Sequence, residues 1–336
     1  MYTQRASVLV GFLTNFTTGA DRRSLTRCII SISCIPDRVR SALRRKSARV
    51  FFLEWLVAGS LLCAGGCSKN VLPIVPTTPA GNDVLPRISD TVRLLAYQHI
   101  ASSSGDPRPT GIYVSTIDSL TTRLVVTGYF QGFDWLPGTD TLIVAASGRI
   151  IAVAASDGSF SSLVTHEAFN PSVSPDGRYV AFDAAAGSRS HLFFLDRYSG
   201  LISDPTPDSM LYEFPSWSPV GSELVVVGAT PTKSGLFTIA ADGRPLRQLT
   251  QTGGADRSPA WSPTGEAIAW EIVSGSTTTL WSTDTVGATH SALIRSYQGI
   301  CWSADGKSLA YSSSTAVGAR IFLLNLTTHQ SRQLTH

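Results

Sequence analysis

The sequence predicts an all-β protein, a six-bladed β-propeller with four strands in each blade, and two observations lead to this prediction. The first is a tight-turn motif that occurs four times, as "VSPDG" at 173–177, "WSPVG" at 217–221, "WSPTG" at 261–265 and "WSADG" at 302–306. The second is spacing: with a degraded fifth turn at Pro137 included, successive turns lie 38, 44, 44 and 41 residues apart, measured between Pro137, Pro175, Pro219, Pro263 and Ala304. Such a period is typical of propeller blades, which bury their faces only against one another.

The turn itself follows from backbone preferences. Ser174, Pro175 and Gly177 occupy positions that favour a type I turn, and glycine can take the left-handed conformation that closes a short hairpin. The third turn position is Asp176 in one copy and Val, Thr or Asp in the others. Because a catalytic or metal-binding carboxylate would not tolerate valine, Asp176 is interpreted as a structural residue.

Each unit continues in the same order after its turn. A second apolar run, a small-residue loop, a third run and a short fourth run follow, as in "LVVVGA", "GLFTIAADG" and "RPLRQLTQ". Two earlier units, from Arg87 and from Phe133, keep this order with degraded turns and bring the total to six. A β-sandwich is the alternative architecture, but it does not require a repeated motif. Because proline fits only the start of such a strand, three prolines are expected to begin innermost strands: Pro171, Pro215 and Pro259.

The repeats resemble the WD-like repeats of TolB-type periplasmic propellers. The matching residues are "PSWSPVGSELVVV", "PAWSPTGEAIAW", "QLTQ" and "RQLTH", and the resemblance covers about residues 85–336. It implies the propeller fold and says little about function, because one fold hosts many functions. TolB proteins carry an additional α/β domain before the propeller, where this sequence has a proline-rich segment. The partners of TolB are therefore not carried over to this chain.

The basic residues are concentrated at the start of the chain. Residues 1–49 hold ten Lys and Arg against two Asp and Glu, whereas residues 68–336 hold seventeen against twenty-one, a net charge of about −4. The second segment has no basic, aromatic-rich pattern of the kind that nucleic-acid binding needs. No nucleic-acid partner is predicted.

The leader ends in a pattern typical of a secreted lipoprotein. An apolar run at 50–62 is followed by small residues and Cys67, and four basic residues precede it: Arg44, Arg45, Lys46 and Arg49. These are the parts of a secretory signal, and the run is too short, with Glu54 inside it, for a membrane-spanning helix. The end resembles the bacterial lipobox, whose cysteine is acylated. An ordinary signal peptide or an uncleaved anchor is the alternative.

The chain is therefore divided into three parts: a leader and signal peptide at 1–66, a lipidated cysteine with a proline-rich tether at 67–84, and the propeller at 85–336. A secretory signal has roughly 15 to 30 residues, so translation is predicted to begin near Val39. Ser68 after the cysteine resembles the sorting pattern of outer-membrane lipoproteins. The predicted location is the cell envelope, on the periplasmic side of the outer membrane.

No catalytic, metal-binding or cofactor motif is found after residue 67. The six histidines lack zinc-type spacing, and neither a G-x-S-x-G elbow nor a phosphate-binding glycine motif occurs. Acylation of Cys67 would leave Cys301 without a disulfide partner, and Cys301 is expected to be a small buried residue. No cofactor and no metal are predicted.

Candidate binding residues follow from the repeat. The positions four and five residues before each inner-strand tryptophan, or its replacement Val173, are expected to line one mouth of the channel. Aromatic, amide and charged side chains gather there, which suits the binding of a peptide, a sugar or a protein loop. The candidates are Gln131, Tyr212, Glu213, Asp256, Arg257, Tyr297 and Gln298.

These observations favour a membrane-anchored, non-catalytic propeller that binds a protein, peptide or glycan of the cell envelope. The alternative is a propeller hydrolase or lyase with carboxylates in the central channel, because a propeller brings distant residues together there. Two or more carboxylates converging within the channel would favour the enzyme.

Overall fold

The computed structural model of the chain describes residues 81–336 except 90–92, 103–105, 118–121, 188, 208–209, 252–254 and 297. The predicted leader, Cys67 and the tether up to residue 80 lie outside the described residues. The regular elements of the described part are β-strands. This part contains no helix with the length and apolar character needed to cross a membrane.

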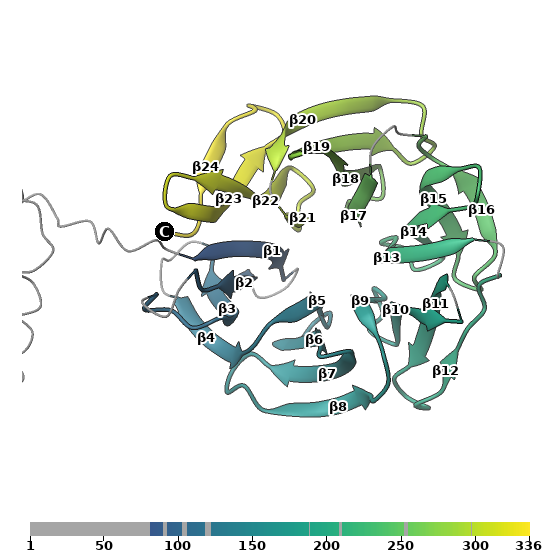
Figure 1. Cartoon of the computed structure of the whole chain (residues 1–336), viewed down its shortest axis with the longest axis horizontal. Helices are drawn as coiled ribbons and strands as arrows, with labels where there is room; N and C mark the ends of the chain where they lie inside the picture. Colours follow the sequence, from purple (N-terminus) through teal and green to yellow (C-terminus); the bar gives the residue numbers. More distant parts are fainter. Residues whose placement is uncertain are drawn as a thin grey trace, which may run out of the picture. The chain divides into compact units, whose positions relative to one another are not determined.

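The strands form six antiparallel sheets of four consecutive strands, arranged around a ring as blades (Figure 1). The first three blades are β1 (Asn82–Ile88), β2 (Leu94–Ile100), β3 (Gly111–Thr116) and β4 (Thr122–Thr127); β5 (Phe130–Trp135), β6 (Thr141–Ala146), β7 (Arg149–Ala154) and β8 (Phe160–Val164); and β9 (Phe169–Val173), β10 (Tyr179–Ala186), β11 (Arg189–Asp196) and β12 (Ile202–Ser203).

The other three blades are β13 (Leu211–Trp217), β14 (Glu223–Ala229), β15 (Ser234–Ala240) and β16 (Pro245–Gln248); β17 (Ala255–Trp261), β18 (Ala267–Ser274), β19 (Thr277–Asp284) and β20 (His290–Ser296); and β21 (Ile300–Trp302), β22 (Ser308–Thr315), β23 (Gly318–Asn325) and β24 (Ser331–Gln333). The first strand of each blade faces the centre of the ring (Figure 1). The predicted six-bladed propeller is confirmed.

The apolar side chains form six clusters, one at each junction between neighbouring blades. Alternate residues of a strand point to opposite faces of its sheet. Thus β10 places Val180 and Phe182 at the junction with the second blade and Ala181 at the junction with the fourth. Both faces of the second strands are buried, which explains why these strands read as continuous apolar runs.

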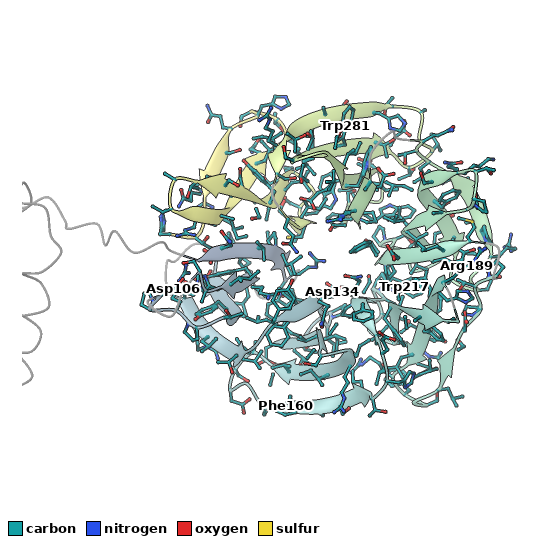
Figure 2. The ribbon with its side chains drawn as sticks, viewed as in Figure 1. Asp106, Asp134, Phe160, Arg189, Trp217 and Trp281 are labelled. Atoms are coloured by element: carbon teal, nitrogen blue, oxygen red, sulfur yellow. The ribbon has the colours of Figure 1, made fainter. Side chains whose placement is uncertain are left out.

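Tryptophans at the ends of three inner strands donate a hydrogen bond to the blade before them. Trp217, labelled in Figure 2, donates its Nε1 hydrogen to Ser172 O at 3.2 Å, and Trp302 donates to Ala260 O at 2.9 Å. Both side chains are buried. The repeated tryptophan is therefore a wedge between blades rather than a surface residue.

A left-handed residue occurs at the same place in every blade, inside the innermost strand in five blades and directly before β21 in the sixth. The six φ angles are 53° at Leu85, 138° at Gly132, 45° at Asn170, 52° at Phe214, 48° at Ser258 and 81° at Gly299. Strand register shifts there in five blades, for example between Glu213 and Ser216, which marks a β-bulge. The expectation that proline begins the inner strand was wrong: Pro171, Pro215 and Pro259 lie inside their strands, where the bulge removes them from the hydrogen-bond ladder.

The ring closes between the first and sixth blades without exchange of a strand, because each sheet consists of four consecutive strands. β1 lies beside the sixth blade (Figure 1), and Leu85 N donates to Gln298 O at 3.2 Å. Ser312 Oγ donates to Asp83 O at 2.8 Å across the same junction.

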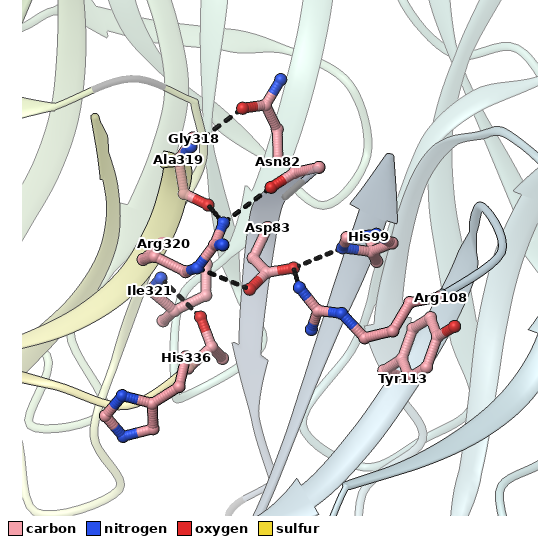
Figure 3. A network of polar contacts seen from close by, with 12 residues as sticks. Asn82, Asp83, His99, Arg108, Tyr113, Gly318, Ala319, Arg320, Ile321 and His336 are labelled. Atoms are coloured by element: carbon pink, nitrogen blue, oxygen red, sulfur yellow. Dashed lines mark hydrogen bonds and ion pairs between the residues drawn. The ribbon is translucent and has the colours of Figure 1, made fainter. Parts of the chain in front are cut away.

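A buried charged network completes this closure (Figure 3). The Asp83 carboxylate lies 2.7 Å from His99 Nδ1. It also lies 3.3 Å from Arg108 Nη2 and 3.9 Å from Arg320 Nε. Arg320 donates Nη1 to Gly81 O at 2.6 Å. Asp83, His99 and Arg320 are each no more than 1% exposed, so this part of the network joins the two ends of the ring out of contact with solvent, whereas the Arg108 side chain is 25% exposed.

The repeated turns have the structure that the sequence predicted. Ser174 Oγ donates to Asp176 Oδ1 at 2.6 Å, and the same carboxylate accepts Arg178 N at 3.0 Å. Gly177 has a φ of 69°. Hydrogen bonds from Ser174 and Arg178 hold the pKa of Asp176 below its ordinary value. The aspartate therefore stabilises its own turn.

Candidate functional site

A cavity of about 200 Å³ lies at the mouth of the channel where the inner strands begin. Three of the predicted residues line it: Gln131, Arg257 and Gln298. Its wall also contains five of the six left-handed positions. Residues from five inner strands thus converge on one opening: Leu85, Gly132, Asn170, Phe214 and Ser258.

The other predicted residues lie elsewhere. Glu213 is half-buried, and its pKa is raised by burial and lowered by the charge of Arg257. Tyr212 is fully buried in the cluster between the third and fourth blades, and Asp256 is 7% exposed, with Oδ1 accepting Trp270 Nε1 at 2.9 Å. The prediction that Tyr212 and Asp256 line the mouth was therefore wrong.

The reason for this error is the alternation of side chains along a strand. Residues four positions before the tryptophan point toward the channel, so residues one step earlier point into the junction between blades. Tyr212 consequently belongs to the core, and burial raises its pKa. Tyr297, the remaining candidate, lies outside the described residues.

Two charged residues of the mouth cavity were missed by the repeat count. Arg87 directly precedes Ile88, the residue that takes the place of the wedge tryptophan in the first blade, where no turn motif marks the register. Glu271 lies on β18, a second strand, and the count considered only first strands. Even with Ile88 aligned on the tryptophans, the counted positions would be Val84 and Asp83, so the count does not reach Arg87, which lies one residue before Ile88.

Glu271 is 2% exposed, and its two oxygens have different surroundings. Oε2 accepts Gly299 N at 3.0 Å, whereas Oε1 has no hydrogen-bond partner among the described residues. Burial raises the pKa of this carboxyl group, and the Gly299 N–H, the Ser296 hydroxyl and the charges of Arg257 and Arg87 oppose that rise. The Ser296 hydroxyl forms no hydrogen bond with Oε1.

A second cavity, of about 330 Å³, lies at the opposite end of the inner strands. Its wall consists mainly of the Ser-Pro turns and the wedge tryptophans, and Arg87 and Asp134 are the charged residues in it. Asp134 lies near the centre of the ring (Figure 2). Since Arg87 lines both cavities, it lies between the two ends of the channel.

Three carboxylates near the inner strands connect neighbouring blades. Asp134 Oδ2 accepts Val173 N at 2.9 Å, Asp183 Oδ1 accepts Phe214 N at 3.1 Å, and Glu271 accepts Gly299 N. In each case the acceptor belongs to one blade and the N–H to the innermost strand of the next. These contacts give the carboxylates a structural role. The described residues contain no group of three or more His, Cys, Asp or Glu side chains arranged for a metal ion.

Bulged inner strands, wedge tryptophans and repeated Ser-Pro turns define this chain as a six-bladed propeller with WD-like repeats. The model of the TolB beta propeller domain family matches residues 145–336. The chain belongs to the TolB β-propeller domain family.

The similarity to individual relatives is partial. The Tol-Pal system protein TolB of Xanthomonas campestris pv. campestris (strain B100) is 34% identical over 115 residues, which are 33% of this chain and 26% of that protein. The aligned part thus spans about a quarter of the relative's length.

Solved structures share the fold. The crystal structure of TolB from Acinetobacter baumannii has a TM-score of 0.60 at 14% identity, covering 86% of this chain and 70% of that chain. Oligogalacturonate lyase in complex with manganese has a TM-score of 0.53 at 12% identity, covering 77% and 78%. At this level of identity the likeness concerns the fold alone.

Proposed function

We propose that this protein is a non-catalytic propeller that binds a protein, peptide or glycan of the bacterial cell envelope. The binding site is the mouth cavity, which Gln131, Arg257 and Gln298 line together with Glu271, whose Oε1 has no hydrogen-bond partner among the described residues. This unused hydrogen-bonding capacity in a concave site is the observation that carries the proposal. The family supports it, since the relative in Xanthomonas is named as a protein of the Tol-Pal system.

The proposed attachment to the membrane is a lipid on Cys67, with the segment up to residue 84 as a tether and the periplasmic side of the outer membrane as the location. In the native bacterium, an alkyne fatty acid should label the wild-type chain and not a Cys67→Ala variant. The variant should also leave the membrane fraction. Equal labelling of both proteins, or an unlabelled wild type, would contradict the lipid anchor.

The binding site is tested by photo-crosslinking in cells, with a photoreactive amino acid placed at one position at a time. Gln298 probes the mouth, the exposed Arg295 on β20 of the fifth blade is a control outside it, and Val220 probes the opposite end of the channel. We expect an envelope partner to crosslink from Gln298 alone. Crosslinking from Val220 but not from Gln298 would move the site to the other cavity.

A further inference from the structure

The mouth cavity concentrates positive charge in a segment that is acidic overall. Residues 68–336 carry a net charge of about −4, yet the cavity wall holds the guanidinium groups of Arg87 and Arg257 and one carboxyl group, that of Glu271. Glu213 lies outside this wall, near enough to Arg257 for the arginine charge to lower its pKa. A concave site with this balance of charge attracts an anionic group.

The two arginines are placed differently. Arg87 donates Nη1 to Pro86 O at 2.9 Å and to Ile300 O at 3.0 Å, which fixes its guanidinium group where the first and sixth blades meet. Arg257 is exposed on the inner strand of the fifth blade. A guanidinium group presents several N–H donors in one plane, so Arg87 keeps donors beyond Nη1, and both residues can bind the two oxygens of a carboxylate.

Glu271 supplies an acceptor in the same cavity. Its Oε1 is buried and has no partner among the described residues, while Oε2 is held by Gly299 N. A buried acceptor without a partner is uncommon in native proteins, and a ligand N–H that reaches it would satisfy it. The site therefore offers cationic donors for an anion and, beside them, one acceptor for a hydrogen-bond donor.

A carboxylate next to an N–H is what a peptide presents at an acidic residue or at its C-terminus. The volume of about 200 Å³ is below the roughly 300 to 1,000 Å³ of typical ligand pockets, which suits one side chain or one chain end rather than a whole ligand. We propose that the mouth cavity binds a peptide carboxylate, with the carboxylate against Arg257 and Arg87 and the adjacent peptide N–H donated to Glu271. This inference rests on the proposed function and names its ligand chemistry.

Two pairs of synthetic pentapeptides test it by calorimetric titration of the full chain at low ionic strength. In the first pair both ends are blocked and the central residue is Glu or Gln; in the second the sequence is neutral and the C-terminus is a free acid or an amide. In one pair or both, the acid should bind about tenfold or more tightly than its neutral twin. The pair that shows the difference identifies the source of the carboxylate. Added salt should reduce the difference.

Arg257→Ala should abolish this preference for the acid, whereas Arg295→Ala, the matched variant of an exposed arginine in the same blade, should keep it. Failure of every acidic peptide to bind, equal binding within both pairs, or a preference that survives Arg257→Ala would overturn the inference. Either of the first two results, combined with crosslinking of a partner from Gln298, would leave the proposed function standing with a neutral ligand. A preference that survives Arg257→Ala, combined with the same crosslink, would leave the proposed function standing with an acidic ligand bound without Arg257. A clear carboxylate preference without any crosslinked partner would support the inference and contradict the proposed envelope partner.

Discussion

At the scale of single residues, buried carboxylates act as acceptors that connect one blade to the next. Asp183 is 5% exposed and accepts hydrogen bonds from Phe214 N and from Asn170 Nδ2. Burial raises its pKa to about 6, although both hydrogen bonds favour the ionised form. The propeller therefore contains a titrating group at the junction of its third and fourth blades.

Stability should respond to pH through this group. Because the folded pKa of about 6 lies above the model value of 3.8, the contribution of Asp183 is fully present below pH 3.8 and is lost as pH rises through about 6. The loss amounts to at most about 3 kcal/mol. An Asp183→Asn variant should therefore gain stability relative to wild type between pH 4.5 and pH 7.5. Urea denaturation at both pH values measures this, and a difference independent of pH would show that Asp183 does not titrate in this range.

The turn residue and the wedge residue should differ in their effect on folding. Trp217→Ala removes a large buried side chain between two blades and should cost about 3 to 5 kcal/mol. Asp176→Ala removes hydrogen bonds at an exposed turn and should cost about 1 kcal/mol or less. Chemical denaturation of both variants compares these losses. Equal losses would show that Asp176 has a role beyond its turn.

The candidate site shows which of its residues could be predicted from the sequence and which could not. Equivalent positions could be found by counting from the tryptophans, and Gln131, Arg257 and Gln298 do line one cavity. The count could not tell which of two successive residues points into the channel, because the bulge that sets this alternation leaves no signal except a proline. Glu271 was not predictable, since its place in the cavity depends on packing between the fifth and sixth blades.

At the scale of elements, the bulged inner strand is the recurring unit. Four of its six left-handed residues are not glycine, although the left-handed conformation is unfavourable for residues with a side chain. Contacts between blades hold this conformation, as Phe214 N and Leu85 N illustrate by donating to the preceding blade. The sequence predicted the strands and their order, whereas these bulges depend on the neighbouring blade and were not predicted.

Gly299, at the ring closure, should tolerate no side chain. A Cβ at Gly299 would lie 2.7 Å from Leu85 Cα, whereas a Cβ at Gly138 meets nothing within 4 Å. Both glycines are left-handed, with φ of 81° and 74°, so Gly138→Ala is a matched control for backbone strain alone. We expect Gly138→Ala to cost about 1 kcal/mol and Gly299→Ala about 3 kcal/mol or more, measured by denaturant melts. Similar losses of stability would show that the first and sixth blades can move apart at Gly299 without a measurable free-energy cost.

At the scale of the whole molecule, closure of the ring depends on buried polar and charged contacts between the first and sixth blades rather than on strand exchange. Removing Asp83 would leave Arg320, which is 1% exposed, buried without its carboxylate. Loss of one partner from a buried ion pair typically costs about 3 to 5 kcal/mol, and Asp83→Ala should lower the unfolding midpoint accordingly. The exposed Arg178–Asp196 pair supplies the control, since Arg178→Ala should leave the midpoint nearly unchanged. An Asp83→Ala protein with the wild-type midpoint would show that the network does not close the ring.

The absence of strand exchange also bears on how such a chain can change over generations. Each blade is encoded by one uninterrupted stretch, because its four strands are consecutive. An in-frame duplication or deletion of that stretch would add or remove a complete blade without dividing any sheet between two distant regions of the gene. Only the residues at the seam, with Asp83 on one side and Arg320 on the other, would have to be kept together. The number of blades can therefore change in evolution independently of the contacts that close the ring.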